Sequence, residues 1–453
     1  MNFNSSATSI VRQLEKNGYS AYIVGGAVRD MLLHRIPKDY DITTDATPEQ
    51  VRQVFGRRRC RIIGRRFRLA LVFDGGESYE VSTFRRDPTK KERRTRPQDD
   101  GVMIWDDNQF GTMEDDVMRR DFTANALYYD VYKDKIIDMV GGVPDIRRRL
   151  VRCIGEPGRR FHEDPVRMLR ALKLAGQFGF TLADDVERAI RENGQLVQEA
   201  SKARLFEELM KIMSSESALE VFGACQDCGF LEHFFPALSH IWDTDGGDVI
   251  KGMLRQHGRC LVEEDNYYHE KSFSLSVLCL PYIIGAMNGC EPSNYQENRN
   301  KCLDAVKLFF SAFPMPREVE FNICDLALMV ADMAAGERLQ RMQSSVLYPL
   351  AYELFRLLTM ASGWMADSFK KLTPPWDESP GLLCLDVQPE GAAAPAKPAS
   401  KARQAPRPKP RHSQAEAGAE ENRQDSAPKR RRRRRRAARE GGDGVDVEAQ
   451  VQG

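Results

Sequence analysis

The stretch Pro37-Lys38-Asp39-Tyr40-Asp41-Ile42 places two acids two positions apart in a segment that favours a β-strand. Because side chains alternate along a strand, Asp39 and Asp41 are expected to point to the same face of a sheet. Such a pair can hold hard divalent cations, and a third carboxylate allows two metal ions to lie together for in-line phosphoryl chemistry. The stretch therefore predicts a strand that carries metal-binding carboxylates.

The segments on either side of this stretch predict a small mixed sheet with helices. Local patterns indicate a helix over residues 8–18, a strand over 21–24, a helix over 28–33, a helix over 48–55 and paired strands over 68–73 and 79–84. The last two strands flank Asp74-Gly75-Gly76, a turn sequence typical of hairpins. Residues 86–113 are polar and rich in arginine, and we expect a mobile loop there. This order of elements predicts an α/β head over residues 1–150.

Helical spacing of apolar residues dominates from Asp164 onward. Asp164 is a candidate helix cap, with Pro165 at the first helical position. Further helices are predicted over residues 201–213, 273–288, 301–313, 318–335 and 345–370, whereas residues 240–270 have no clear pattern. We therefore expect the head to be followed by an all-α part, divided into a neck over residues 151–215 and a body over residues 216–385.

The C-terminal segment, residues 386–453, differs from the rest in composition. Residues 391–453 contain 16 Lys and Arg against 8 Asp and Glu, a balance of +8, although the net charge of the whole chain is only +1. The segment has few large apolar residues and cannot bury enough surface to offset the entropy of ordering, so we expect a disordered basic tail. Its uninterrupted basic run from Lys429 to Arg436 would either attract RNA phosphates or serve as a solvated tail that aids solubility.

The composition of this 453-residue chain favours a soluble, cytoplasmic protein. No run of about 18 apolar residues predicts a membrane span. The N-terminus also lacks the apolar segment of a secretory signal. The ten cysteines have no spacing typical of a disulfide framework, which fits reduced thiols. We therefore expect a cytoplasmic monomer without a membrane span.

Two further motifs carry groups that suit phosphate binding. The Gly25-Gly26 turn follows the first predicted strand, where backbone N–H groups can approach an anion, and Arg29 lies on the helix that comes next. Arg119 and Arg120 begin the motif Arg-Arg-Asp-Phe-Thr-Ala-Asn, and their guanidinium forks match phosphate oxygens. Both motifs therefore predict contacts to the phosphates of a nucleoside triphosphate.

A third motif supplies groups that can select a base. Asp164 and Arg167 are three positions apart at a helix start, so they should share one face. An ionised aspartate only accepts hydrogen bonds and an arginine only donates them, which makes the pair complementary to the amine and ring nitrogen of adenine. Arg170 continues along the helix and would contact phosphate or brace the site. Cytosine has the same donor–acceptor order, so excluding CTP must depend on the size and rigidity of the pocket.

Together these motifs resemble the class II nucleotidyltransferases of the polymerase-β superfamily, which include bacterial poly(A) polymerases and tRNA CCA-adding enzymes. The matching patterns are Gly-Gly-x-x-Arg-Asp, Asp-x-Asp, Arg-Arg-Asp-Phe-Thr-x-Asn and Glu-Asp-Pro-x-Arg-x-Leu-Arg, all between residues 25 and 170. The segment Gly64-Arg65-Arg66-Phe67-Arg68-Leu69-Ala70 is similar to the poly(A) polymerase branch. The likeness is dense over residues 20–215 and thin over residues 216–385.

The resemblance implies Mg²⁺ as the cofactor and ATP as the substrate. It implies catalytic roles for Asp39, Asp41 and Asp121, with Asp39 and Asp41 as magnesium ligands. Glu80, on a predicted neighbouring strand, is the rival of Asp121 for the position of third ligand, and both alternatives stay open at this point. The residues expected to bind the nucleotide are Gly25, Gly26, Arg29, Arg119, Arg120, Asp164, Arg167 and Arg170.

The same resemblance implies a template-independent polynucleotide adenylyltransferase, which adds AMP from ATP to RNA 3′ ends, releases pyrophosphate and so promotes RNA turnover. RNA 3′ ends and ATP are the expected partners, with RNA-degradation machinery as a further partner class. A tRNA CCA-adding nucleotidyltransferase is the alternative, because it would share every catalytic motif. A non-catalytic RNA-binding protein is a third hypothesis. The intact pair Asp39 and Asp41 argues against it, since unpaired buried acids are costly without a metal.

Overall fold

The computed structural model describes residues 3–64, 68–86, 109–264, 267–268, 270–288, 294–372 and 374. Most of the expected mobile loop, residues 87–108, lies outside the described residues. The expected disordered tail lies outside them as well, so both expectations remain predictions. All other elements below belong to the described part of the chain.

One mixed sheet forms the centre of the head. Within the described residues its seven strands follow the order β3 (Cys60–Ile63), β4 (Leu69–Asp74), β5 (Glu77–Thr83), β2 (Asp41–Thr44), β1 (Ala21–Val24), β6 (Leu127–Asp130) and β7 (Lys135–Asp138). β2 and β5 run parallel, whereas each of the other neighbouring pairs is antiparallel. The predicted hairpin is confirmed, because β4 and β5 pair from Ala70 opposite Val81 to Asp74 opposite Glu77. The predicted small mixed sheet is confirmed with it.

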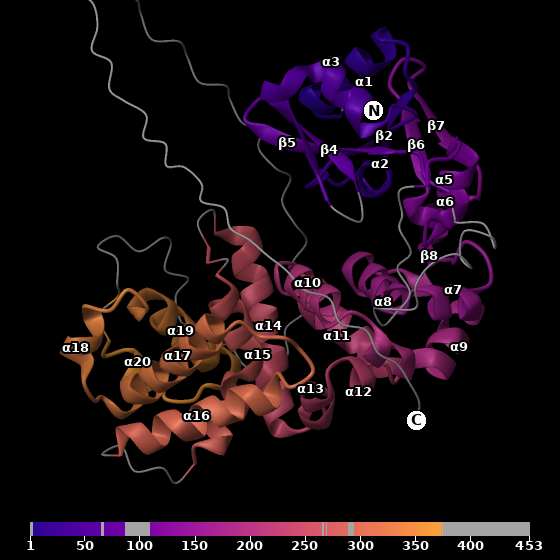
Figure 1. Ribbon diagram of the computed structural model, residues 1–453. Coiled ribbons are helices and arrows are strands. Elements are labelled where there is room, and N and C mark those ends of the chain that lie inside the picture. The colour runs from indigo at the N-terminus through magenta and orange to yellow at the C-terminus, as the bar shows by residue number, and fades with distance from the viewer. Residues whose placement is uncertain are drawn as a thin grey trace, which may run out of the picture. The chain divides into compact units, whose positions relative to one another are not determined.

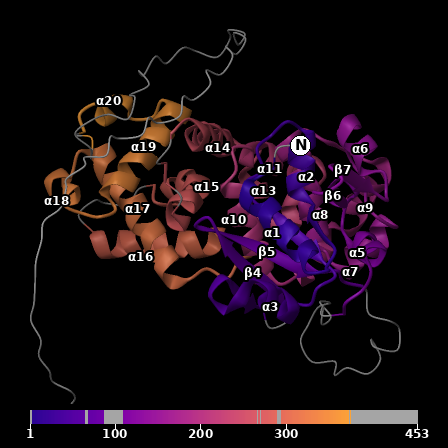
Figure 2. The ribbon, with the colours of Figure 1, turned by 90° about the horizontal axis from the view of Figure 1, so that it is seen from above.

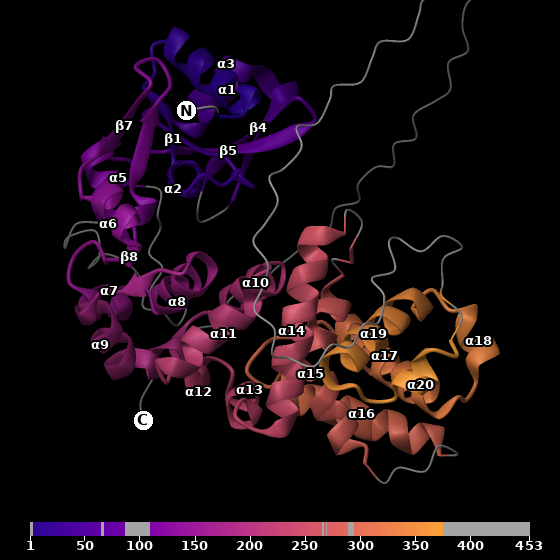
Figure 3. The ribbon, with the colours of Figure 1, turned by 180° about the vertical axis from the view of Figure 1, so that it is seen from behind.

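Helices cover both faces of the sheet. The head contains α1 (Ser5–Lys16), α2 (Gly26–Leu32), α3 (Pro48–Arg59), α5 (Met113–Arg119) and α6 (Gly142–Arg148). α1 and α3 lie on the same side of the sheet (Figure 1 and Figure 3), where they pack on alternate strand residues such as Ile23, Ile42 and Val81. The intervening residue Val24 points to the opposite face and packs with Val117 of α5. The alternation of side chains along the strands therefore assigns each residue to one of two separate cores.

The neck and body are helical, as predicted. Their helices are α7 (Pro157–Glu163), α8 (Val166–Phe178), α9 (Asp184–Asn193), α10 (Lys202–Met213), α11 (Ala218–Asp227), α12 (Leu231–Phe234), α13 (Pro236–Ile241), α14 (Asp245–Glu263), α15 (Lys271–Ala286), α16 (Tyr295–Phe309), α17 (Arg317–Ala335), α18 (Leu339–Gln343), α19 (Tyr348–Ser362) and α20 (Ala366–Phe369). A short parallel pair, β8 (Leu150–Val151) and β9 (Thr181–Leu182), lies at the start of the neck. In the body, α17 packs against α15, α16 and α19 (Figure 2).

Most of residues 240–270, which had no clear sequence pattern, form the 19-residue helix α14. The glycines of α14 lower its helix propensity and so weaken the helical signal in the sequence. Their role is to let other segments pack closely against the helix. A Cβ atom at Gly258 would lie 2.4 Å from the carbonyl oxygen of Glu216, and one at Gly252 would lie 2.8 Å from the Cβ of Ala361. These contacts depend on distant segments, so a local pattern could not reveal them.

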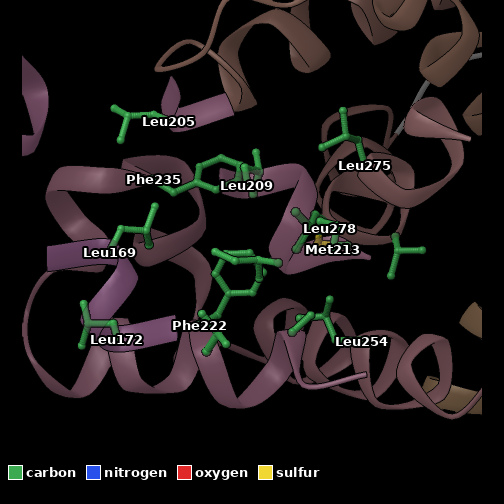
Figure 4. Close-up of a cluster of buried hydrophobic side chains, with 14 of the residues drawn as sticks. Leu169, Leu172, Leu205, Leu209, Met213, Phe222, Phe235, Leu254, Leu275 and Leu278 are labelled. Atoms are coloured by element: carbon green, nitrogen blue, oxygen red, sulfur yellow. The ribbon is translucent and has the colours of Figure 1, made fainter. Parts of the chain in front are cut away.

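A continuous apolar core fixes the neck helices against the first body helices. Figure 4 shows Leu169 and Leu172 of α8, Leu209 of α10, Phe222 of α11 and Leu254 of α14 in this core, and all are buried. Fully burying one such side chain contributes about 1.5–3 kcal/mol. The charged residues that α8 and α10 direct at each other are therefore held in place by the packing beneath them. None of the described helices combines the length and apolarity needed to cross a membrane.

Candidate active site

Two carboxylates lie side by side where the parallel strands β2 and β5 meet. Ile42 pairs with Val81, so Asp41 and Glu80 each stand one residue before this pair. Ile42 and Val81 are buried in the core beneath α1 and α3. Because side chains alternate, Asp41 and Glu80 point to the opposite face, and both are exposed. The register thus brings together two acids that are far apart in the sequence.

The surroundings of Asp41 disfavour its charged form. Although Asp41 keeps contact with solvent, the protein atoms that surround its carboxylate are the main cause that raises its pKa, and the nearby carboxylates of Glu80 and Asp39 raise it further. Arg120 and Lys211 act in the opposite direction. Among the described residues, no hydrogen bond or ion pair satisfies the carboxylates of Asp39, Asp41 or Glu80. The three acids therefore form a focus of negative charge, and no basic side chain in the described ranges pairs with them directly.

Asp39 lies near this focus but not on the strand. The prediction that it lies on the same strand as Asp41 is wrong, because β2 begins at Asp41. The physical reason is the register: Asp41 pairs with Val24, the last residue of β1. The chain then turns at Gly25, so β1 offers no partner to residues before Asp41. Asp39 is exposed in the connection that leads into β2.

Asp121 occupies a different environment from Asp41 and Glu80. Its Oδ1 accepts hydrogen bonds from the backbone N–H of Phe122 at 2.8 Å and from Nδ2 of Asn125 at 3.2 Å. Its Oδ2 lies 3.5 Å from Nη1 of Arg170. Burial alone would raise the pKa of Asp121, but Arg170 and these hydrogen bonds lower it. Asp121 is therefore an ion-paired carboxylate whose partners come from protein.

The Gly25-Gly26 turn is shaped by its neighbours. Gly25 has a φ of 68°, a conformation that strongly favours glycine. Its N–H already donates to the carbonyl oxygen of Leu127 at 3.0 Å. A Cβ atom at Gly25 would lie 3.4 Å from Nη1 of Arg120. The turn thus brings the backbone close to an arginine of the Arg-Arg-Asp motif.

Arg29 and Arg120 are both engaged with protein groups. Arg29 donates to Oδ1 of Asp30 at 2.7 and 2.9 Å and to Oδ1 of Asn125 at 2.7 Å, and its guanidinium lies 4.3 Å from the ring centre of Phe178. A phosphate contact from Arg29 would have to share or replace these bonds.

Arg120 is held by a buried polar group. Its Nε and Nη2 donate to Oδ2 of Asp116 at 3.3 and 3.1 Å, and Nε also donates to the hydroxyl of Tyr128 at 3.1 Å. Burial would lower the pKa of Arg120, but Tyr128 and Asp116 raise it overall. Arg119 precedes it at the end of α5, and its carbonyl oxygen accepts from Arg160 at 2.7 Å.

Asp164 and Arg167 lie together at the junction of α7 and α8, but they bond to different partners. Asp164 accepts from Arg204 at 2.9 and 3.0 Å and from Arg170 at 3.0 Å. Arg167 donates to the carbonyl oxygen of Arg160 at 3.0 Å and to Oε2 of Glu163 at 3.4 Å. The pKa of Asp164 is lowered, since its arginine partners outweigh the effect of burial.

The sequence patterns did not single out three residues that organise this region. Arg204 of α10 binds both oxygens of Asp164. Asn125 links Arg29 to Asp121. Arg160 donates to the carbonyl oxygens of both Arg119 and Arg120, at 2.7 and 2.9 Å. Asn125 stands inside a quoted motif and could have been found there, whereas Arg204 has only its position at a helix start to mark it.

Comparison with known proteins now adds to this geometry. Residues 21–152 match the model of the poly A polymerase head domain, and residues 179–241 match that of the probable RNA and SrmB-binding site of polymerase A. The head is therefore similar to poly A polymerase head domains. This nucleotidyltransferase head contains Asp41, Glu80 and Asp121, while Arg204 lies within the second matched segment.

The relatives include two kinds of enzyme. Poly(A) polymerase I of Salmonella typhi is 39% identical over 255 residues, which are 56% of this chain and 54% of the relative. The CCA-adding enzyme of Lactobacillus helveticus is 39% identical over 219 residues, which are 48% of this chain and 52% of the relative. The chain thus spans about half the length of the curated relatives it matches.

A solved structure resembles a larger part of the fold. The structure of the Bacillus stearothermophilus CCA-adding enzyme in complex with CTP has a TM-score of 0.55 and 27% identity to this chain. The match covers 82% of this chain and 78% of that structure.

The nucleotidyltransferase head offers a partial fit to a divalent cation. Asp41 and Glu80 supply oxygen ligands on one face, and their mutual repulsion is the kind that a cation relieves. In the described part of the chain, however, no group of three or more His, Cys, Asp or Glu side chains is arranged to hold a metal ion. A three-carboxylate site would therefore require Asp39 to approach the other two.

Proposed function

We propose that this chain transfers AMP from ATP to RNA 3′ ends and releases pyrophosphate, without a template. The observation that carries the proposal is the pair Asp41 and Glu80, two carboxylates on adjacent parallel strands without a described basic partner. It lies in a head of the poly A polymerase type, followed by a matched RNA-binding segment. Two adjacent carboxylates without a basic partner can bind a divalent cation, which would neutralise them and take part in nucleotidyl transfer.

Asp39, Asp41 and Glu80 would hold Mg²⁺. When bound, Mg²⁺ supplies charge neutralisation at the phosphates and a lower pKa for the attacking 3′-hydroxyl. We favour Glu80 over Asp121 as the third acid. Glu80 raises the pKa of Asp41 and shares its face of the sheet, whereas Asp121 is paired with Arg170. Asp121 would instead position Arg170, and through Asn125 also Arg29.

The remaining groups would orient the nucleotide. Arg119 and Arg120 would attract the triphosphate, since a guanidinium keeps its charge at any physiological pH. The Gly25-Gly26 turn lets the triphosphate approach the backbone near Arg120. Asp164 would accept from the amine of adenine, and Arg167 would donate to its ring nitrogen.

A CCA-adding activity is the second candidate function. It is supported by the fold similarity to the CCA-adding enzyme bound to CTP and by relatives of that type at 38–39% identity. Poly(A) synthesis, the first candidate, is supported by poly(A) polymerase relatives whose matches cover more residues than those of the CCA-adding enzymes. Both activities would use the same carboxylates and arginines.

An incorporation assay tests the proposal and separates the two functions. The full chain is incubated with Mg²⁺ and one NTP at a time, on a generic RNA primer and on tRNA lacking its CCA end. Tail growth on the generic primer with ATP alone supports poly(A) synthesis. Addition limited to tRNA, with CTP first and ATP afterwards, supports the CCA alternative. Absence of incorporation by the wild-type protein, equal to an Asp41→Asn control, would refute both.

A further inference from the structure

The Asp164 carboxylate has no acceptor capacity left in this structure. Its Oδ1 accepts from the backbone N–H of Val166 at 3.2 Å and from Nη1 of Arg204 at 3.0 Å. Its Oδ2 accepts from Nη2 of Arg204 at 2.9 Å and from Nη2 of Arg170 at 3.0 Å. A carboxylate offers about four lone-pair positions, and all are occupied. The amine of a base can therefore bond to Asp164 only if one of these donors leaves.

Arg204 is the donor that can leave most readily. The N–H of Val166 belongs to the first residue of α8 and is fixed by the helix. Arg170 also contacts Asp121, so it is held on two sides. Arg204 has Asp164 as its sole hydrogen-bond partner within the described ranges, and its side chain is 32% exposed. A ligand in solution can thus reach Arg204 without disturbing the core.

The position of Arg204 indicates which ligand would draw it away. It lies on α10, inside the segment that matches the RNA-binding model. Guanidinium groups form bidentate bonds with phosphate as they do with carboxylate. An RNA phosphate would therefore replace one anionic partner of Arg204 with another, so that its charge stays paired. Asp164 would keep Arg170 and gain the amine of the base.

We propose that Arg204 is a specificity-determining latch on Asp164, which RNA releases. In the RNA-free protein Arg204 occupies the acceptor positions of Asp164, and binding of RNA phosphate to Arg204 exposes Asp164 to the base. RNA and ATP then bind with positive coupling, because RNA raises the fraction of molecules that can read adenine. This inference rests on the proposed function, in which Asp164 reads the base.

The test compares nucleotide binding with and without RNA. The affinity of the full chain for a non-hydrolysable ATP analogue is measured alone and with a saturating RNA oligonucleotide that ends in a 3′-deoxynucleotide. For wild type we expect RNA to tighten analogue binding about 5-fold or more, within the usual range of coupling. Arg204→Gln should bind the analogue tightly without RNA, and RNA should change its affinity less than about 2-fold.

Arg191→Gln is the matched control. Arg191 lies in the same matched segment and pairs with Glu187 at 2.7 Å, so the variant loses the same charge without touching Asp164. It should keep the wild-type coupling. Arg204→Lys retains the charge but cannot bind both oxygens of Asp164 in a fork. Its coupling between RNA and the ATP analogue should therefore fall between that of wild type and that of Arg204→Gln. A thermal melt checks that each variant is folded. If Arg204→Gln does not fold, the coupling measured for Arg204→Lys tests the latch in its place.

Two results would overturn the latch. Equal analogue affinity of wild type with and without RNA would show that RNA does not release Asp164. Weaker binding by Arg204→Gln in both conditions would show that Arg204 only positions Asp164. The incorporation assay keeps these outcomes separate from the proposed function, because wild type would still extend RNA if the latch alone were wrong.

Discussion

Arg170 joins Asp121 of the head to Asp164 of the neck, with its Nη1 3.5 Å from Oδ2 of Asp121 and its Nη2 3.0 Å from Oδ2 of Asp164. One guanidinium thus connects the acid of the Arg-Arg-Asp motif to the acid expected to select the base. Burial would lower the pKa of Arg170, but the two carboxylates raise it overall. Asp121 is thus ion-paired with Arg170, whereas Glu80 has no such partner among the described residues. We therefore expect the two acids to have different roles.

Glu80 and Asp121 should respond differently when each is neutralised. Glu80→Gln should raise the Mg²⁺ concentration needed for half-maximal incorporation, and it should preserve or increase the free energy of unfolding, because it relieves repulsion with Asp41. Asp121→Asn should leave the Mg²⁺ dependence near wild type and lower the free energy of unfolding by about 1–3 kcal/mol, since Arg170 loses a charged partner. Magnesium titrations and urea unfolding measure both effects. The opposite pattern would assign the metal to Asp121.

Substitution of either Asp39 or Asp41 should abolish incorporation. Asp39→Ala and Asp41→Ala remove acids that have no described protein partner, so the fold and RNA binding should change little. Single-turnover incorporation at saturating Mg²⁺, together with an RNA-binding titration, measures the two properties separately. A double variant that retains more than a small fraction of the wild-type rate contradicts the assignment.

Base selection should depend on Asp164 and Arg167. Asp164→Ala and Arg167→Ala should lower ATP use and narrow its lead over UTP and GTP, because those bases reverse the donor–acceptor order. Losing one good polar pair costs on the order of 1–3 kcal/mol, so each variant should lose about 5- to 150-fold in kcat/KM for ATP. Competition between NTPs on one primer measures the selectivity. If both variants keep full ATP selectivity, the residues serve only as a helix cap and a brace.

The basic tail should contribute RNA affinity and not catalysis. Removal of residues 391–453 takes away a balance of +8. RNA binding should weaken and its salt dependence should flatten, because fewer counterions are released from the RNA. The kcat on saturating primer should stay near wild type. Binding isotherms at several salt concentrations provide the slope, and an unchanged slope would favour a tail that only aids solubility.

Glu15 should make folding stability depend on pH. Burial, with the nearby carboxylate of Asp130, raises the pKa of Glu15 from 4.5 to about 7. The folded protein thus holds a proton that the unfolded chain releases, so the free energy of unfolding should fall as pH rises from about 4.5 to about 7. One pKa unit corresponds to about 1.4 kcal/mol, and because Glu15 is only partly buried, solvent screening should reduce the loss to about 1–2 kcal/mol.

Urea unfolding at several pH values measures this dependence. Glu15→Gln should flatten the curve in that window, because it cannot ionise. The exposed Glu207 on α10 provides the control, since Glu207→Gln should keep the wild-type dependence. A curve for Glu15→Gln that matches wild type would locate the titrating group elsewhere.

The sequence by itself determined the elements whose causes are local. The two strand patterns on either side of Asp74-Gly75-Gly76 predicted the β4–β5 hairpin, and the helical spacing of apolar residues over 201–213 predicted α10. The motifs indicated a nucleotidyltransferase head. Each of them, whether a glycine turn, a pair of acids or a group of arginines, consists of residues close together in the sequence and can be recognised without knowing the fold.

Only the tertiary structure decided which charged groups meet. Glu80 lies beside Asp41 because β5 pairs parallel to β2, and Arg204 reaches Asp164 across 40 positions of sequence. The end of β1 at Val24 leaves Asp39 without a strand partner, which no pattern within the stretch itself could indicate. An ion pair or a strand register depends on how separate elements pack on a shared core, and its energy arises at distances of a few ångströms in space, whatever the separation along the chain.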